Sequence, residues 1–269
     1  MSRLAAVFAK LEQDGRKALV PYIVAGDPAP ALTVPLMHEL VSKGADILEI
    51  GVPFSDPMAE GPVIQLAHER ALANKVTLSM VLELVAEFRA TDSTTPVVLM
   101  GYANPVEHMG YQQFADRASA AGVDGLLTVD MPPEEAEQAT QILRAAGIDN
   151  IFLLAPTTSD ERIQKIASLA SGYLYCVSLN GVTGAGHLNV AAVTEKLASI
   201  KRHTNLPITV GFGIKDGASA AALAPLCEGV VVGSALIERI VATDSALNNT
   251  ERAAVAAELI AEIRTAIDA

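Results

Sequence analysis

Short apolar runs recur along this chain, and between them apolar residues repeat every three or four positions. Continuous runs of Val, Ile and Leu are typical of buried strands, whereas the intervening spacing is that of amphipathic helices. The runs predict strands at residues 19–24, 46–51, 96–101, 125–129, 150–154, 173–177, 208–211 and 229–232. Helical spacing is found at residues 31–43, 78–90, 111–121, 134–146, 160–169 and 190–201.

The order of these elements, strand then helix throughout, predicts the fold class. Strands that are apolar along their whole length are buried on both faces, as in a parallel sheet covered by helices. Eight repeats in 269 residues predict an α/β protein with a closed (β/α)8 TIM barrel, and we expect residues 1–269 to form one domain. Extra helices precede the first strand and occupy residues 249–269, where they would cover the barrel's bottom and outer surface.

Several helix ends carry signals of their own. Gly44, Gly122 and Gly147 each follow an apolar helical pattern, at the position where a left-handed residue closes a helix. Asp160 and Asp216 stand where N-caps would be expected. These signals predict helix boundaries independently of the apolar spacing.

Composition and charge exclude some classes of function. Hydrophobic residues make up 51% of the chain and aromatic residues only 4%, with no Trp, so the core must consist of Ala, Val, Leu and Ile. The formal net charge of −12 is spread without a basic patch, which argues against a nucleic-acid partner. Cys176 and Cys227 have no CxxC or metal-ligand spacing, so we expect buried thiols, a reducing compartment and no metal site.

No segment has the pattern expected of a signal peptide or a membrane helix. Residues 1–17 alternate apolar and charged positions, and Lys10 interrupts their apolar stretch. The uncharged span 166–194 contains many Ser, Gly and Asn residues. We therefore expect a cytoplasmic protein without membrane contact.

Two acidic residues are the first candidates for chemistry. Glu49 interrupts the apolar strand 46–51, and burying a carboxylate is costly unless it is paired or takes part in a reaction. Glu60 follows on the Gly/Pro-rich loop. Such a pair suits a reaction with two proton transfers. In a barrel the active site lies at the carboxyl ends of the strands, where further polar candidates also fall: Tyr102, Asn104, Asp130 and Tyr175.

Two of these candidates have ordinary structural alternatives. A tyrosine in an apolar strand, such as Tyr175, is most often a core residue with a hydrogen-bonded hydroxyl. Asp130 stands before Pro132 and suits a turn. Both alternatives stay open at this point.

Glycine clusters follow the last three predicted strands, at residues 180–186, 211–214 and 233–234. One such cluster is ordinary turn chemistry. Three of them at the ends of strands six to eight match the phosphate site frequent in barrels, where backbone N–H groups and a helix N-terminus bind the anion. We expect a phosphate monoester, bound without a Lys or Arg side chain.

Five short motifs occur in barrel order: Gly-Asp-Pro at 26–28, Pro-Phe-Ser-Asp-Pro at 53–57, Tyr-Ala-Asn at 102–104, Gly-Val-Thr-Gly at 181–184 and Gly-Phe-Gly-Ile at 211–214. With them the chain resembles the alpha subunit family of tryptophan synthase from its first helix to its last. The resemblance implies retro-aldol cleavage of indole-3-glycerol phosphate to indole and glyceraldehyde 3-phosphate, without a cofactor or metal in this chain. It also implies a partner, the pyridoxal-phosphate-dependent beta subunit, in an alpha2-beta2 heterotetramer.

The same resemblance implies roles for individual residues. Glu49 would move a proton between the C3′ hydroxyl and indole C3, Glu60 would accept a hydrogen bond or proton from the indole N–H, and Tyr175 would support the surroundings of Glu49. The remaining roles fall to groups of residues: an apolar indole slot of Tyr22, Leu127, Leu153 and Phe212, a phosphate site of Gly184, Gly213, Gly233 and Ser234, and a partner-contact loop with Pro53 and Asp56.

Two departures from the family pattern leave questions open. Glu60 replaces the usual aspartate, and its alternative interpretation is a solvated loop acid. Leu179 stands where some members carry an arginine near the phosphate loop, which makes the phosphate site depend more on backbone amides.

Two other functions remain as alternatives. One is a different barrel enzyme acting on sugar phosphates, such as an isomerase or indole-glycerol-phosphate synthase, disfavoured because no strand-end Lys or second strand-end Glu supports it. The other is a non-catalytic barrel kept as an allosteric partner.

Overall fold

Eight parallel strands, each paired with its neighbours in sequence order, close into a barrel through pairing of the last strand with the first. The computed structural model describes residues 2–177, 190–211 and 213–269. The predicted (β/α)8 barrel is confirmed, and the strand boundaries differ from the predicted ones by at most two residues. The strands are β1 Ala18–Val24, β2 Leu48–Gly51, β3 Val97–Gly101, β4 Gly125–Thr128, β5 Asp149–Leu154, β6 Leu174–Val177, β7 Ile208–Gly211 and β8 Gly229–Val232.

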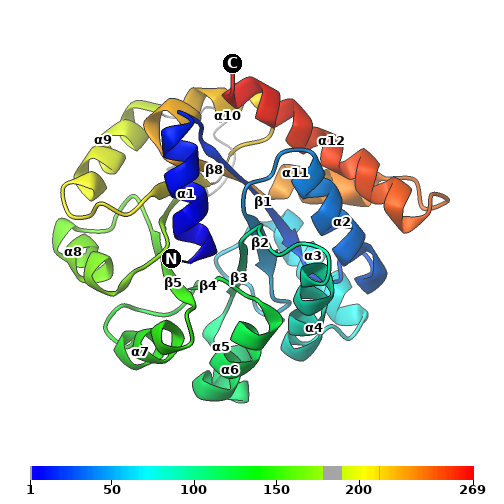
Figure 1. Ribbon diagram of the computed structural model, residues 1–269, viewed down its shortest axis with the longest axis horizontal. Coiled ribbons are helices and arrows are strands. Elements are labelled where there is room, and N and C mark those ends of the chain that lie inside the picture. The colour runs from blue at the N-terminus through cyan, green and yellow to red at the C-terminus, as the bar shows by residue number, and fades with distance from the viewer. Residues whose placement is uncertain (1, 178–189, 212) are drawn as a thin grey trace.

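Helices surround the barrel, as Figure 1 shows. They are α1 Arg3–Gln13, α2 Pro30–Ser42, α3 Pro62–Ala73, α4 Leu78–Arg89, α5 Ala103–Met109, α6 Tyr111–Ala121, α7 Glu137–Ala145, α8 Asp160–Leu169, α9 Val190–Lys201, α10 Gly217–Leu223, α11 Ser234–Ala242 and α12 Asn249–Ile267. A 3₁₀ turn, Ala224–Leu226, follows α10.

Four of these helices, α3, α5, α10 and α11, were not predicted from the apolar spacing. The helices α5 and α10 have only 7 residues each, too few for a repeat to show. In α3 the pattern is partly inverted, because His68 lies on the buried face while Leu66 is 52% exposed. Local periodicity therefore fails where a helix is short or buries a polar residue.

The predicted helix ends are mostly confirmed. Gly44, Gly122 and Gly147 all have positive φ angles, as a helix-closing residue requires. Asp216 caps α10 by accepting a hydrogen bond from the Ser219 N–H at 2.8 Å. The prediction for Asp160 is wrong: Ser159 is the N-cap of α8, and Asp160 lies in the first helical turn, where a negative charge also favours the helix.

The two additional helices occupy the predicted positions. Leu4 and Phe8 of α1 are buried, and the Phe8 ring lies 5.8 Å from that of Tyr173, which precedes β6. This contact puts α1 over the amino ends of the strands, as Figure 1 also shows. The helix α12 packs on α2 and α10 at the outer surface. Cys176 and Cys227 are free and buried, as expected, and no helix in the described ranges is long and apolar enough to cross a membrane.

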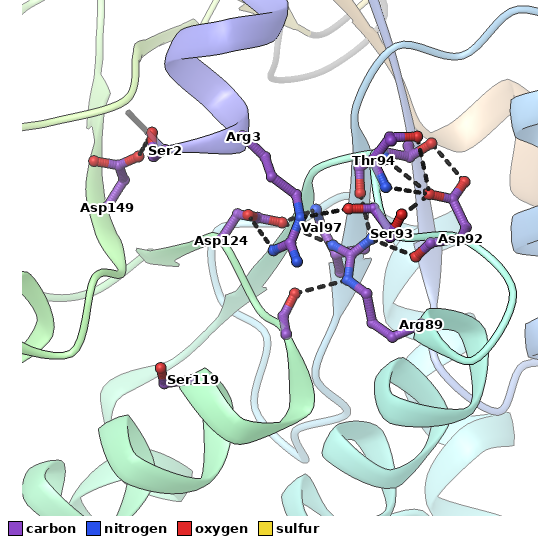
Figure 2. A network of polar contacts seen from close by, with 12 residues as sticks. Ser2, Arg3, Arg89, Asp92, Ser93, Thr94, Val97, Ser119, Asp124 and Asp149 are labelled. Carbon is purple, nitrogen blue, oxygen red and sulfur yellow. Dashed lines mark hydrogen bonds and ion pairs between the residues drawn. The ribbon is translucent and has the colours of Figure 1, made fainter.

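A charged network joins α1 to the bottom of the barrel (Figure 2). Asp124, which precedes β4, accepts hydrogen bonds from Arg3 Nη1 at 2.9 Å, from Arg89 Nη2 at 2.8 Å and from the Val97 N–H at 2.8 Å. Arg89 also donates to the carbonyl oxygen of Gly122 at 2.9 Å. Because Asp124 is only 4% exposed, these contacts satisfy a carboxylate that water does not reach.

Replacement of Asp124 by Ala should therefore destabilise the barrel. Arg89 would lose its nearest buried counter-charge and keep only Asp92 at 3.9 Å, and breaking a buried pair typically costs about 3–5 kcal/mol of unfolding free energy. Urea denaturation of Asp124→Ala, compared with Asp116→Ala on the exposed surface of α6, measures this effect. Equal midpoints for the two variants would contradict a structural role for the network.

Candidate active site

A cavity of about 290 Å³ lies at the carboxyl ends of the strands, at the opposite end of the barrel from α1. Its walls include Glu49 from β2, Tyr22 from β1 and Tyr175 from β6. The register of the parallel strands places Tyr22 beside Glu49 and Leu153 beside Tyr175. The predicted site residues in its wall are Tyr22, Glu49, Glu60, Tyr175, Gly213, Gly233 and Ser234.

The other predicted site residues lie elsewhere or are not described. Leu127 is fully buried in β4, and Leu153, on β5, lines a separate hollow with Asp130 and Arg162. Neither leucine is among the described residues that wall the first cavity. The predicted positions Phe212 and Gly184, together with Leu179, lie outside the described residues.

Glu49 is fully buried, and this burial raises the pKa of its carboxyl group to about 8. The Tyr173 hydroxyl donates a long hydrogen bond to Glu49 Oε1, at 3.4 Å. Among the described residues, no group hydrogen-bonds Oε2. A carboxyl group in this setting is protonated at neutral pH and can donate its proton into the cavity.

Tyr173 is a residue that the sequence analysis missed, since it singled out Tyr175 two positions later. Tyr173 just precedes β6 and Tyr175 is on it, and because they are two positions apart their side chains point to the same side of the sheet. The hydroxyl of Tyr175 instead lies against β7, where a Cβ at position 211 would collide with it. Gly211 is therefore needed for the close approach of this tyrosine.

Glu60 lies beside the same cavity, with a side chain only 2% exposed. Burial raises the pKa of its carboxyl group to about 7. Tyr102 donates a hydrogen bond to Glu60 Oε2 at 2.9 Å, and its own hydroxyl oxygen accepts one from the Ala59 N–H at 3.1 Å. The Phe54 ring stacks on the Tyr102 ring at 5.0 Å. The alternative interpretation of Glu60 as a solvated loop acid is therefore wrong.

Asp130 has a structural contact, in line with one of the two interpretations left open, and His68 is a further residue near the cavity. Asp130 accepts a hydrogen bond from the Ala103 N–H at 2.7 Å, so it satisfies the first turn of α5 from the loop after β4. His68, which the sequence analysis did not consider, is 1% exposed and lies within 3.8 Å of Glu60 Oε2. Its position on the inward face of α3 was hidden because that helix was not predicted.

The glycines expected to bind phosphate line one part of the cavity. Gly213 has a φ angle of +81°, and Gly233 precedes α11, whose first residue is Ser234. Lys215 and Glu238 line the same cavity. The loop after β7 thus brings one basic side chain into the wall, and phosphate binding without Lys or Arg stays a prediction. Among the described residues, no cluster of His, Cys, Asp and Glu has the arrangement of a metal site.

The two carboxyl groups make the cavity suitable for acid–base chemistry. Their raised pKa values leave Glu49 mostly protonated and Glu60 about half ionised near pH 7. The charge on Glu60 further raises the pKa of Glu49, so the two groups titrate as a coupled pair. One donor and one acceptor are thus available together at neutral pH.

Comparison with known proteins identifies the family. A family model described as tryptophan synthase alpha chain matches residues 8–266. The tryptophan synthase alpha chain of Methylococcus capsulatus is 57% identical over 269 residues and covers all of both chains. That of Thioalkalivibrio sulfidiphilus is 58% identical over 268 residues, also covering all of both chains.

Comparison with solved structures identifies the same family. The tryptophan synthase subunit alpha of Legionella pneumophila superposes with a TM-score of 0.92 at 46% identity, covering 100% of this chain and 99% of that one. A chain of tryptophan synthase from M. tuberculosis in an aminoacrylate-bound form has a TM-score of 0.87 at 33% identity, covering 99% and 100%. The chain belongs to the tryptophan synthase alpha chain family, and it is a lyase that cleaves indole-3-glycerol phosphate to indole and glyceraldehyde 3-phosphate in tryptophan biosynthesis.

Proposed function

We propose that Glu49 and Glu60 are the proton-transfer groups with which this chain cleaves indole-3-glycerol phosphate. The observation that carries the proposal is that two buried carboxyl groups with raised pKa values line one cavity. Such groups are expensive to bury without a counter-charge, which is typical of functional sites.

In the proposed reaction Glu49 donates its proton to indole C3, which turns the ring into a leaving group. The bond between C3 and C3′ then breaks, its electrons return to the indole ring, and the C3′ hydroxyl becomes the carbonyl of glyceraldehyde 3-phosphate. The hydroxyl proton passes to Glu49, which is thereby restored to its protonated state. Positive charge develops on the indole nitrogen during this sequence, and Glu60 stabilises it by accepting a hydrogen bond or proton from the N–H.

Other residues bind and orient the substrate in this proposal. Tyr173 holds Glu49 through its hydroxyl, and Tyr175 packs against the same part of the wall. The indole ring lies in a slot that we assign to Tyr22 and, from the sequence resemblance alone, to Phe212; Leu127 and Leu153 do not line this cavity and are not assigned to it. The phosphate is held by the backbone of Gly184, Gly213, Gly233 and Ser234, with the N-terminus of α11 directed at the anion. The reaction needs no cofactor or metal in this chain.

Membership of the family implies a complex with the beta subunit, and we propose the alpha2-beta2 stoichiometry for this chain, with pyridoxal phosphate in the partner and the assembly in the cytoplasm. The proposed contact loop contains Pro53, which is buried, and Asp56, which is exposed. Met58 in this loop is 81% exposed, and an apolar side chain of this kind favours a protein contact.

Glu49→Gln should fold and bind substrate yet lose about 10²–10⁴-fold in kcat, the usual contribution of a general acid–base group. Indole release by the purified variant measures this loss. Glu83→Gln, on α4 outside the cavity, is the matched control. A wild-type rate in Glu49→Gln would remove Glu49 from the mechanism.

The same variant should be more stable than the wild type above pH 5. The folded state keeps the Glu49 proton up to about pH 8, whereas the unfolded chain releases it near pH 4.5. Wild-type stability is therefore lost as pH rises between these values, and glutamine abolishes that loss. Thermal unfolding at pH 5 and pH 8 should show a gain in Tm for Glu49→Gln that is larger at pH 8.

The pH profile of kcat/KM should be bell-shaped around pH 7 to 8. Activity should rise as Glu60, whose pKa is about 7, becomes ionised and fall as Glu49, whose pKa is about 8, loses its proton. Glu60→Gln should lower kcat and flatten the acidic limb. If that limb stayed unchanged in Glu60→Gln, another group would be responsible for it.

Inorganic phosphate should compete with the substrate, because the proposed site binds the anion through backbone amides. Gly213→Val should raise KM sharply, since Gly213 has a φ angle of +81° that a β-branched residue resists. Steady-state kinetics with added phosphate tests both points. Absence of competition at high phosphate would exclude this part of the cavity as the anion site.

A further inference from the structure

His68 is a buried ionisable residue to which the proposed mechanism assigns no part. It lies in the middle of α3, is 1% exposed, and contacts three different segments around the cavity. These segments are the loop after β2 through Phe54, the strand β1 through Tyr22, and the loop acid Glu60.

The contacts determine where the His68 ring carries its proton. The Phe54 N–H donates a hydrogen bond to His68 Nδ1 at 3.0 Å. A backbone N–H can only donate, so Nδ1 must have a free lone pair. Burial lowers the pKa of His68 to about 4, which leaves the ring neutral near pH 7. The single proton is therefore on Nε2.

The Nε2–H faces one acceptor and, slightly farther away, one carboxylate. Nε2 lies 3.3 Å from the Tyr22 hydroxyl oxygen and 3.8 Å from Glu60 Oε2. Since Nε2 donates, the Tyr22 oxygen accepts, and the Tyr22 hydroxyl proton remains free to be donated elsewhere. The same hydroxyl lies against Gly51 at the end of β2, where a Cβ would collide with it. Tyr22 is thus held from two sides at the cavity wall.

The helix that carries His68 is itself firmly held. Two residues further along α3, Arg70 forms a bidentate pair with Asp27, with its Nε 2.6 Å from Oδ1 and its Nη2 2.8 Å from Oδ2. Asp27 is only 4% exposed. The ring of His68 is therefore presented from a rigid element, as accurate positioning requires.

We propose that His68 is a positioning residue for the cleavage reaction: its Nδ1 holds the loop that leads to Glu60, and its Nε2–H fixes the Tyr22 hydroxyl beside the Glu60 carboxylate. The inference rests on the proposed role of Glu60. It explains how the Glu60 carboxylate can be held in one position although Glu60 lies on a loop and not on a strand.

The groups around Glu60 determine how much its ionisation depends on His68. The titratable groups that face Glu60 come from four elements: Tyr102 after β3, Tyr22 on β1, Glu49 on β2 and His68 on α3. Tyr175 on β6 is also near enough for the Glu60 charge to raise its pKa. None of these is a cation at neutral pH. Within the described ranges, Lys215 is the basic residue in the wall of the same cavity. Loss of the Nε2–H should therefore make the Glu60 anion less favourable.

A pair of substitutions separates the two functions of the ring. His68→Asn places an amide oxygen near the position of Nδ1 and can still accept from Phe54, but it is too short to reach Tyr22 or Glu60. His68→Gln can place an amide N–H near the position of Nε2 but has no acceptor at Nδ1. His38→Asn is the matched control, because His38 on α2 contacts Thr91 outside the cavity.

We expect His68→Asn to lower kcat for indole release by about tenfold or more, with a smaller change in KM, because the Tyr22 hydroxyl loses its donor and Glu60 loses the N–H dipole 3.8 Å away. The acidic limb of its kcat/KM profile should shift to higher pH. His68→Gln should recover part of both effects, and His38→Asn should match the wild type. Tm values for all variants show how far each remains folded at the assay temperature.

Three results would overturn the inference, and they are distinguishable. Wild-type kcat and pH profile in His68→Asn, with Glu60→Gln impaired, would remove His68 while leaving the role of Glu60 intact. Equal losses of kcat in His68→Asn and His68→Gln, with the acidic limb of the kcat/KM profile unshifted, would identify His68 as a packing residue only. Normal activity in Glu60→Gln would instead remove the proposed role of Glu60, and that of His68 with it.

Discussion

The burial of Glu49 without a counter-charge is the constraint on which the upper half of this barrel depends. A fully buried carboxyl group with one long hydrogen bond is stable only in its protonated form near neutral pH. Among the described residues, no cation contacts the Glu49 carboxyl group, and tyrosine and apolar side chains lie around it. The same requirement supplies a proton donor in the wall of the cavity, which is what the proposed cleavage of a carbon–carbon bond needs.

The acids at the two ends of β2 have different surroundings, one suited to stability and the other to function. Asp46, just before β2, pairs with Arg264 of α12 at 2.9 Å and accepts a hydrogen bond from the Leu19 N–H at 2.8 Å. Glu49 is only three residues further on and has no such partner among the described residues. The acid at the bottom of β2 is paired and stabilises the fold, whereas the acid at its top is left without a counter-charge. This division is common in barrels, where the carboxyl ends of the strands carry the chemistry.

Glycines at strand ends and a helix anchored by arginine organise the cavity wall. Gly51 and Gly211 leave room for the hydroxyls of Tyr22 and Tyr175, so each tyrosine reaches across to the neighbouring strand. Arg70 pairs with Asp27, which gives the Gly-Asp-Pro motif a structural purpose: it fixes the helix that carries His68. The motif near β1 and the acid on the loop after β2 are thus linked through α3, although they lie far apart in the sequence.

The sequence by itself determined the barrel, the positions of all eight strands to within two residues, and Glu49 as an anomalous acid, because these follow from periodicity and from the cost of burying a charge. It also carried the family resemblance. The partners of each acid were decided only by the tertiary structure: Tyr173 for Glu49, and Tyr102 and His68 for Glu60. Those contacts join residues that are between 8 and 124 positions apart. No local pattern encodes such distances, since they depend on how strands close into a barrel and on how a helix with an irregular apolar face packs against it.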